Sequence, residues 1–343
     1  MKLNPLTHNF DTQSEYFGAI YAAGMGFAKP DARLMNAAAT AIASGSTGAD
    51  GGFLMPPAFE DEIRERIFED PDSSLGLCDV RGVKKSIETF PTDDTPSWAT
   101  SGGVRVGYAD EIGPIEQSKL KVGALSVRAR KLATVMVLTN ELKEDSNIGA
   151  YIERTVPRKF KYKLTQLKIS GLGAGEMLGV LNSPALITVA AEASQTAATF
   201  NTANACNMWS RMWSGGYARA VWMIGPDVPS VLPHLNSTGL NIFTPGDAEA
   251  PVGRIFGRPV IVHEACEALG DLGDVLLADW GEYLLAFRTP APRQSASIHC
   301  YFDRDLQAFK FTWRVDGMPW WGAPVPSRTG NLTRSPFVAL AAR

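Results

Sequence analysis

Side chains that could do chemistry are scattered along this sequence instead of being gathered into a motif. The histidines are far apart, so they do not repeat at the short spacings that zinc sites use. They are His8, His234, His263 and His299. The four cysteines also stand far apart and form no Cys-x-x-Cys pair, so we expect buried, reduced thiols. They are Cys78, Cys206, Cys266 and Cys300.

Two short segments resemble ligand-binding motifs, but neither has the further features that such a motif needs. The glycine-rich run 171–175 resembles a phosphate loop, but it follows a predicted helix and lacks the Lys-Ser/Thr of a P-loop. We therefore predict a tight turn there. Asp110 and Glu111 are adjacent acids that could ligate a cation, although neighbouring acids on a loop are usually solvated. No nucleophile elbow of the Gly-x-Ser-x-Gly type is present. We therefore predict no catalytic residue, no metal site and no cofactor.

The strongest charged feature is a basic run in a predicted helix. Its members are Arg154, Arg158, Lys159, Lys161, Lys163 and Lys168. Such a row can contact nucleic-acid phosphates without sequence specificity, or it can form a solvated or interface-facing surface. Both interpretations stay open. Seven tryptophans after residue 200 are expected to fill the core and interfaces. They are Trp209, Trp213, Trp222, Trp280, Trp313, Trp320 and Trp321.

Composition narrows the class of protein. The 343 residues are 45% hydrophobic and carry a formal net charge of −3, which fits a globular chain and argues against a dedicated nucleic-acid binder. No apolar run approaches the roughly 18 residues that a membrane span needs. The first ten residues lack the layout of a secretory signal, so we expect a cytosolic protein.

The predicted elements suggest assembly. Residues 1–50 form an arm that ends in a Gly/Ser-rich hinge, and a short amphipathic helix is predicted over 59–68. Residues 120–138 alternate apolar with polar, which predicts one long strand belonging to a projecting hairpin, with 132–138 returning to the core. A helix is predicted from Asn147 to about Ser170, kinked by Pro157. Arms and hairpins of this kind need partner surfaces to offset the conformational entropy lost when they become ordered.

A mixed α and β pattern follows residue 171. Helices are expected at 203–213 and 227–235. Strands are expected within 76–92 and at 220–224, 259–263, 274–279, 283–288, 297–302 and 308–314.

The order of these features resembles the major capsid proteins of tailed bacteriophages with the Hong Kong 97 fold. The segment Gly51-Gly-Phe-Leu-Met-Pro-Pro57 resembles the family's arm terminus, and 109–116 with the following strand resembles its extended loop. Residues 137–146 are similar to the junction with the spine helix, and 171–182 to the entry into the axial domain. Residues 255–261 with 274–280, and 303–316, resemble the later strands.

The resemblance implies an α+β fold and a domain order. It comprises an N-terminal arm (1–55), a peripheral domain in three parts (56–96, 137–175 with the spine helix, and 290–318), an extended loop (97–136), an axial domain (176–289) and a C-terminal segment returning to the axial domain (319–343). The extended loop, with Asp110, Glu111, Lys119 and Lys121, is expected to contact other subunits.

The resemblance also implies a coat subunit that forms hexamers and pentamers of an icosahedral head around double-stranded DNA. Scaffolding, portal and cement proteins are the expected further partners, the virion capsid is the expected location, and the host cytoplasm the site of assembly. Some family members form an isopeptide bond between a loop lysine and an asparagine, helped by a glutamate. Residues 307–319 contain neither asparagine nor glutamate, so we expect no self-crosslinking.

Two alternatives stay open. An encapsulin-type compartment shell shares the fold, but encapsulins usually lack a long N-terminal arm, so residues 1–50 favour the phage interpretation. An α/β enzyme would need a convergent polar pocket, which the sequence does not indicate.

Overall fold

The computed structural model describes residues 42–43, 74–93, 95–96, 98, 103–104, 106–108, 117–119, 121–141, 148–236, 241–248, 250–297 and 305–343. The predicted arm, apart from 42–43, and the predicted helix 59–68 lie outside these residues, as do Asp110, Glu111, His8, His299 and Cys300. The chain divides into two compact units. Unit 1 contains 1–66, 133–157 and 292–312, and unit 2 contains 67–132, 158–291 and 313–343.

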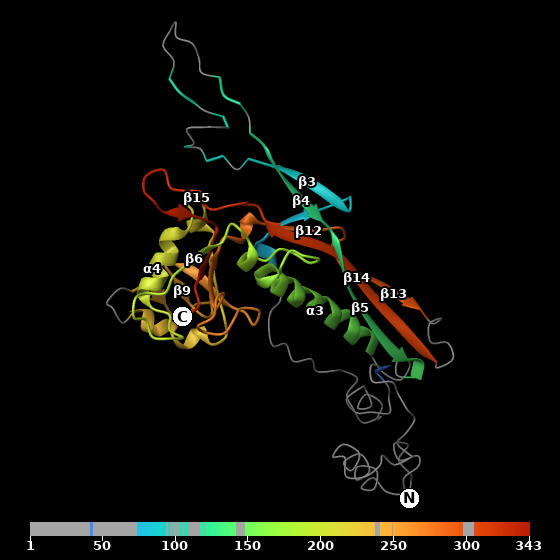
Figure 1. Cartoon of the computed structure of the whole chain (residues 1–343). Coiled ribbons are helices and arrows are strands. Elements are labelled where there is room, and N and C mark those ends of the chain that lie inside the picture. The colour runs from blue at the N-terminus through green and yellow to red at the C-terminus, as the bar shows by residue number, and fades with distance from the viewer. Residues whose placement is uncertain are drawn as a thin grey trace, which may run out of the picture. The chain divides into compact units, whose positions relative to one another are not determined.

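Unit 2 is built around a seven-stranded mixed sheet in the order β6-β17-β11-β7-β10-β9-β8. Figure 1 shows β6 beside helix α4 (Thr202–Arg211). Its strands are β6 (Ile187–Val189), β7 (Val221–Ile224), β8 (Phe243–Thr244), β9 (Arg254–Ile255), β10 (Arg258–Val262), β11 (Val275–Ala278) and β17 (Phe337–Leu340). Strands β7, β11 and β17 are buried at every position. Continuous apolar runs of this kind are typical of strands covered on both faces.

One helix of this sheet's core has a clear sequence cause. Helix α4 (Thr202–Arg211) begins after Asn201, whose side chain accepts a hydrogen bond from the Asn204 backbone N–H, while the Asn204 side chain accepts from the Asn201 backbone N–H. This reciprocal cap satisfies two backbone donors that the first turn leaves unpaired. Met208 and Met212 then pack fully buried in the core around Trp222. The predicted helix at 203–213 is confirmed.

The other helix predicted in this region, 227–235, was wrong in type. The segment forms two 3₁₀ turns, η6 (Val228–Ser230) and η7 (Leu232–Asn236). Pro229 and Pro233 lack the backbone N–H that a continuous α-helix uses, which favours the tighter, shorter turns. Leu232 and Leu235 are nevertheless buried, so the apolar pattern still marks the core.

A second sheet of unit 2 brings together β2 (Asp79–Gly82), β12 (Tyr283–Phe287) and the second half of β14 (Leu306–Pro319). Strand β12 is parallel to β2 and antiparallel to β14. Next to them β3 (Ile87–Thr92) and β4 (Gly123–Arg128) form a six-pair antiparallel ladder, with Phe90 opposite Leu125. The single strand predicted over 120–138 is therefore two strands, because β4 pairs with β3 whereas β5 (Arg130–Thr139) joins another ladder.

Unit 1 contains most of β5, the first half of β14, β13 and β1 (Ile42–Ala43). Strand β13 (Arg293–Ser297) pairs antiparallel with β14, and β1 pairs parallel with β5 at Val137 and Leu138. The strand predicted over 297–302 thus begins earlier in the chain, and residues 298–302 lie outside the described ranges.

Helix α3 (Ile148–Ser170) ends at the residue predicted, and it continues through Pro157. Apolar residues at helical spacing form its buried stripe, including Ile148, Ile152, Phe160 and Leu164. The glycine-rich run that follows is the predicted tight turn, with Gly173 at φ +76° and Gly175 at φ +90°. A Cβ on Gly171 would lie 2.3 Å from the Met177 carbonyl oxygen, so only glycine lets the two chains approach this closely.

Candidate assembly surfaces and a buried lysine

The loop beyond the β3–β4 ladder exposes apolar side chains in an alternating row. Val104 is 66% exposed, and Val106 and Tyr108 are essentially fully exposed, at 98% and 110%. The three side chains lie within five residues of the chain, and no other described part of the chain covers them. Exposed apolar surface of this kind usually marks a contact with another molecule.

The same loop returns through two of the predicted contact residues. Lys119 pairs with Gly103 in an antiparallel bridge, and both Lys119 and Lys121 are exposed. The structure therefore places these two lysines on the returning side of the loop, just before β4. The other two predicted loop residues, Asp110 and Glu111, lie outside the described ranges.

The basic run of α3 is not one uniform surface. Arg154, Lys159 and Lys163 are exposed, whereas Arg158 and Lys161 are half-buried. Lys159 and Lys163 are four residues apart and share one side of the helix, whereas Arg154 lies five residues before Lys159 and points to another side. For these exposed residues, phosphate contact and a protein interface both stay open as interpretations.

The sixth member of that run was predicted wrongly, because Lys168 is completely buried. Its ammonium donates to the Ser74 carbonyl oxygen at 3.1 Å and lies 3.8 Å from the centroid of the Trp280 ring. The physical reason is helical periodicity: Phe160, Leu164 and Lys168 follow one another at four-residue intervals on the buried face. The four-residue spacing in the sequence therefore indicates that Lys168 is buried, whereas its charge alone suggested an exposed residue.

Burial sets the acid–base behaviour of this cluster. Desolvation lowers the pKa of Lys168 from 10.5 to about 8, with the Cys78 and Cys266 thiols opposing the shift. Burial, followed by the neighbouring Lys168, lowers the pKa of His263 to about 4. The His263 ring stacks on Tyr162 with the centroids 6.0 Å apart. Burial also raises the pKa of the Cys78 thiol, so this cysteine is not an activated nucleophile.

A groove on unit 2 combines aromatic rings with carboxylates. It has a volume of about 440 Å³. Its lining comprises Asp79, Arg81, Phe90, Pro91, Thr92, Asp93, Gly281, Glu282, Trp320 and Trp321. Three of these side chains are carboxylates and one is a guanidinium, so the lining is net acidic.

Hydrogen bonds from tryptophan hold the acids of this groove in place. The Trp320 indole N–H donates to Asp79 Oδ2 at 3.1 Å, and the Trp321 indole N–H donates to Glu282 Oε2 at 3.0 Å. Arg81 also donates to Asp79 Oδ2, at 3.0 Å, and its guanidinium lies 4.9 Å from the centroid of the Trp320 ring. Because both bonds to Asp79 use the same oxygen, Oδ1 is left for a further donor.

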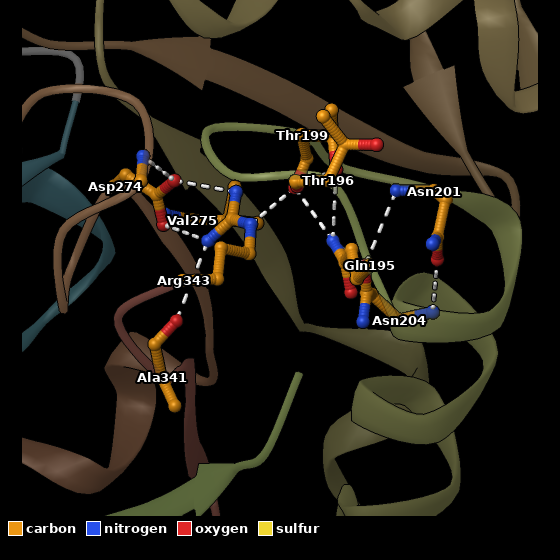
Figure 2. A network of polar contacts seen from close by, with 10 residues as sticks. Gln195, Thr196, Thr199, Asn201, Asn204, Asp274, Val275, Ala341 and Arg343 are labelled. Atoms are coloured by element: carbon orange, nitrogen blue, oxygen red, sulfur yellow. Dashed lines mark hydrogen bonds and ion pairs between the residues drawn. The ribbon is translucent and has the colours of Figure 1, made fainter. Parts of the chain in front are cut away.

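A buried ion pair joins two distant segments of unit 2 (Figure 2). Arg343 donates to both oxygens of Asp274, at 2.6 Å and 3.2 Å, and the two side chains are 1% and 0% exposed. Arg343 Nε also donates to the Thr199 carbonyl oxygen, which Gln195 Nε2 contacts at 2.8 Å. Asp274 is further held by the backbone N–H groups of Gly270 and Val275. The network is structural, because its charged groups are sealed from solvent and paired with one another.

Features that would suggest an enzyme site are not found among the described residues. No group of three or more His, Cys, Asp or Glu side chains there could hold a metal ion. No helix in those ranges is long and apolar enough to cross a membrane. Cys78 and Cys266 are buried free thiols, as predicted, whereas Cys206 is half-buried. Trp222, Trp280 and Trp313 are buried, which confirms the core role predicted for these three.

Comparison with known proteins identifies the family. A family model described as the phage capsid family matches residues 51–324. No curated protein matches the chain.

Solved capsid structures share the fold. The capsid of an empty GTA particle has a TM-score of 0.65 at 18% identity, with 87% of this chain and 99% of that chain covered. A structure titled Microbacterium phage Oxtober96 has a TM-score of 0.58 at 14% identity, covering 86% and 98%. The SrpI encapsulin of Synechococcus elongatus has a TM-score of 0.53 at 11% identity, covering 82% and 92%.

Proposed function

Since this chain belongs to the phage capsid family, we propose that its copies tile the icosahedral head that encloses the double-stranded DNA of a tailed phage. The observation that carries the proposal, beyond the family itself, is the apolar row of Val104, Val106 and Tyr108. A folded subunit that exposes such a row needs a second surface to cover it. Subunits arranged around five-fold and six-fold axes supply that surface by heterologous contact, in which one patch meets a different patch on the next copy.

The domain order implied by the resemblance is part of this proposal. Two features of unit 2 support it: β17, near the C-terminus, pairs with β11 and β6 in the seven-stranded sheet, and β2 joins β12 and β14 in the other. The first pairing returns the C-terminal segment to the proposed axial domain. In the second, β12 pairs with both β2 and β14, which supports joining two of the proposed peripheral parts, and it adds β12 to their sheet although the resemblance assigns residues 283–287 to the axial domain.

The role we propose is structural and not catalytic. Lys168 is the most perturbed amine, yet it is fully buried and its neighbouring thiol Cys78 has a raised pKa. Neither group can approach a substrate in this conformation. Scaffolding, portal and cement proteins are proposed as further partners in assembly.

Contact with packaged DNA is proposed for the exposed side of α3. Lys159 and Lys163 form a pair of exposed cations on one side of the helix that can approach phosphates without reading sequence. Replacing Lys159 and Lys163 with glutamine is expected to reduce the salt dependence of DNA binding by unassembled subunits, because fewer counterions are released. An unchanged salt dependence assigns the pair to a protein interface.

Velocity sedimentation tests the proposed function. The 37.0 kDa subunit is expected to convert into particles that sediment as megadalton assemblies in a single sharp zone. A protein that stays a monomer or small oligomer over all concentrations, salts and crowding agents that assemble other shells contradicts it.

An encapsulin-type shell is the second candidate, favoured by the match to the SrpI encapsulin. Both shells would sediment alike, so their contents separate them. Particles isolated from phage-producing cells are expected to contain double-stranded DNA, whereas an encapsulin shell would contain a protein cargo and no genome.

A further inference from the structure

A carboxylate from a distant strand holds the point where β4 passes into β5. Strand β4 ends at Arg128, β5 begins at Arg130, and Ala129 alone separates them. We propose that Asp316 of β14 fixes the direction in which the β3–β4 ladder and its loop leave the sheet of β12 and β14, so that a single subunit already presents the loop in its working orientation. The value of this orientation for assembly rests on the proposed function, whereas the orientation itself does not.

Asp316 holds this junction with both of its carboxylate oxygens. Oδ2 accepts a hydrogen bond from the Arg128 backbone N–H at 2.9 Å, across 188 positions of sequence, and Oδ1 accepts one from the Gly317 backbone N–H at 2.9 Å. Burial raises the pKa of Asp316, while these two N–H groups and the Arg130 guanidinium oppose the rise. The residue is 5% exposed, so loss of either donor would leave a buried oxygen without its partner.

A side-chain acceptor at this position lets the strand change partners. Strand β4 is hydrogen-bonded to β3, whereas β5 is hydrogen-bonded to β14. A backbone N–H that lies between two ladders must find another acceptor. For Arg128 the acceptor is the Asp316 carboxylate, and for Ala129 it is the Ser86 carbonyl oxygen at 3.0 Å. Successive N–H groups of an extended chain point to opposite sides, so the junction is held from both sides.

The residues flanking the junction are held as well. Val127 and Ala129 are buried in a cluster that includes two residues of β12. The Arg130 guanidinium donates to the Gly173 carbonyl oxygen at 3.4 Å, which ties the start of β5 to the glycine-rich turn. Side chains fixed in a packed core leave the backbone between them few alternative directions. The Asp316 bond therefore acts on a segment that is anchored at both ends.

An aromatic contact supports the ladder farther from the junction. Phe90 of β3 meets Trp320 edge to face, with the ring centroids 5.8 Å apart. The Arg81 guanidinium lies 5.6 Å from the Phe90 centroid and 4.9 Å from the Trp320 centroid. Phe90 stands opposite Leu125, three residues from Arg128. Two contacts at separate points define a direction, and Asp316 supplies the one at the junction.

Amide hydrogen exchange of unassembled subunits, read residue by residue by NMR, tests the bond. The Arg128 amide is expected to be protected in the wild type. Asn has a single acceptor oxygen, so Asp316→Asn is expected to speed exchange at Arg128 or Gly317 about tenfold or more. The amide of Leu277, in the seven-stranded sheet, is expected to stay unchanged and reports an intact fold. Asp227→Asn, at an exposed aspartate, is the control and is expected to change neither amide.

The distance between two spin labels tests the direction of the ladder. The labels are carried on non-natural residues that replace Ala124, exposed on β4, and Ala203, exposed on α4. In unassembled wild-type subunits one narrow distribution of distances is expected, and Asp316→Asn is expected to broaden it. The folded variant is also expected to yield fewer closed particles than wild type at equal concentration, because its loop is no longer pre-oriented.

The wild-type results alone can overturn the inference. A broad label distribution, or an Arg128 amide that exchanges as fast as in an unfolded chain, overturns it even if Asp316→Asn does not fold. A folded variant that matches wild type in exchange, in label distances or in particle yield overturns it too. Failure of the wild type to form particles refutes the proposed function instead, while the two measurements on unassembled subunits still decide the orientation.

Discussion

At the scale of single residues, Lys168 sets a testable dependence of stability on pH. In the folded chain its pKa is about 8, whereas the unfolded value is 10.5. Between these two values the unfolded chain holds a proton that the folded chain has released, so the free energy of unfolding rises with pH. Below pH 8 both states are protonated, and the folded state keeps a buried charge.

Lys168→Met removes this linkage while preserving the shape of the side chain. The stability difference between the variant and wild type, measured by denaturant unfolding of unassembled subunits, is expected to shift by about 3 kcal/mol between pH 7 and pH 10.5, in favour of wild type. Using the difference cancels other groups that titrate in this range. Lys163→Met, at an exposed lysine of the same helix, is the control and is expected to show no such shift. A constant difference for Lys168→Met means that the lysine reaches solvent.

The Arg343–Asp274 pair gives a second prediction at this scale. Arg343→Met leaves Asp274 buried without its cation, which is expected to cost about 3–5 kcal/mol of subunit stability. Asp274→Asn combined with Arg343→Met should recover part of the loss, because no unpaired charge remains. Thermal and denaturant unfolding measure both, with the exposed Arg328→Met as control. A loss below 1 kcal/mol for Arg343→Met would show that the pair contributes little.

At the scale of elements, the exposed loop row should matter for assembly and not for folding. Val106→Asp with Tyr108→Ser is expected to leave the free energy of unfolding within about 0.5 kcal/mol of wild type, because neither side chain packs in the subunit. The same variant is expected to lose assembly, measured by sedimentation. Val106→Leu with Tyr108→Phe keeps the apolar surface and should assemble. Normal particles from the polar variant would show that the row is not an interface.

Elements with a local pattern could be predicted from the sequence. The apolar stripe of α3, the capped α4 and the buried strands β7 and β11 follow from periodicity and residue type. The helix predicted over 227–235 forms 3₁₀ turns instead, because Pro229 and Pro233 lack the backbone N–H groups that a continuous α-helix needs. Lys168 was misassigned because its charge was considered without its position in the four-residue series.

Features that depend on distant segments were beyond local pattern. The groove needs Trp320 and Asp79 to meet, and these residues are 241 positions apart. Likewise the sequence of β4 and β5 alternates like a single strand. They are two strands because β4 pairs with β3 whereas β5 pairs with β14. Pairing of this kind is set by tertiary packing, which a single sequence does not reveal.

At the scale of the whole molecule, the shell is expected to be held by noncovalent contacts. Strand β14 contains no asparagine and no glutamate, so the partners of an isopeptide bond are missing from it. Boiling assembled particles in detergent should therefore release only the 37.0 kDa monomer on a gel. A ladder of covalent oligomers would contradict this and would direct attention to Lys119 and Lys121 as its source.

Electron microscopy of the assembled wild-type protein tests the central claim most directly. The proposed function predicts closed icosahedral shells, tens of nanometres across, in which five-fold and six-fold clusters of this subunit are resolved. In their density the Val104–Tyr108 row should be covered by a neighbouring copy. Filaments, irregular aggregates or a persistent monomer, obtained from protein that is folded by circular dichroism, would contradict the assignment as a shell-forming coat subunit.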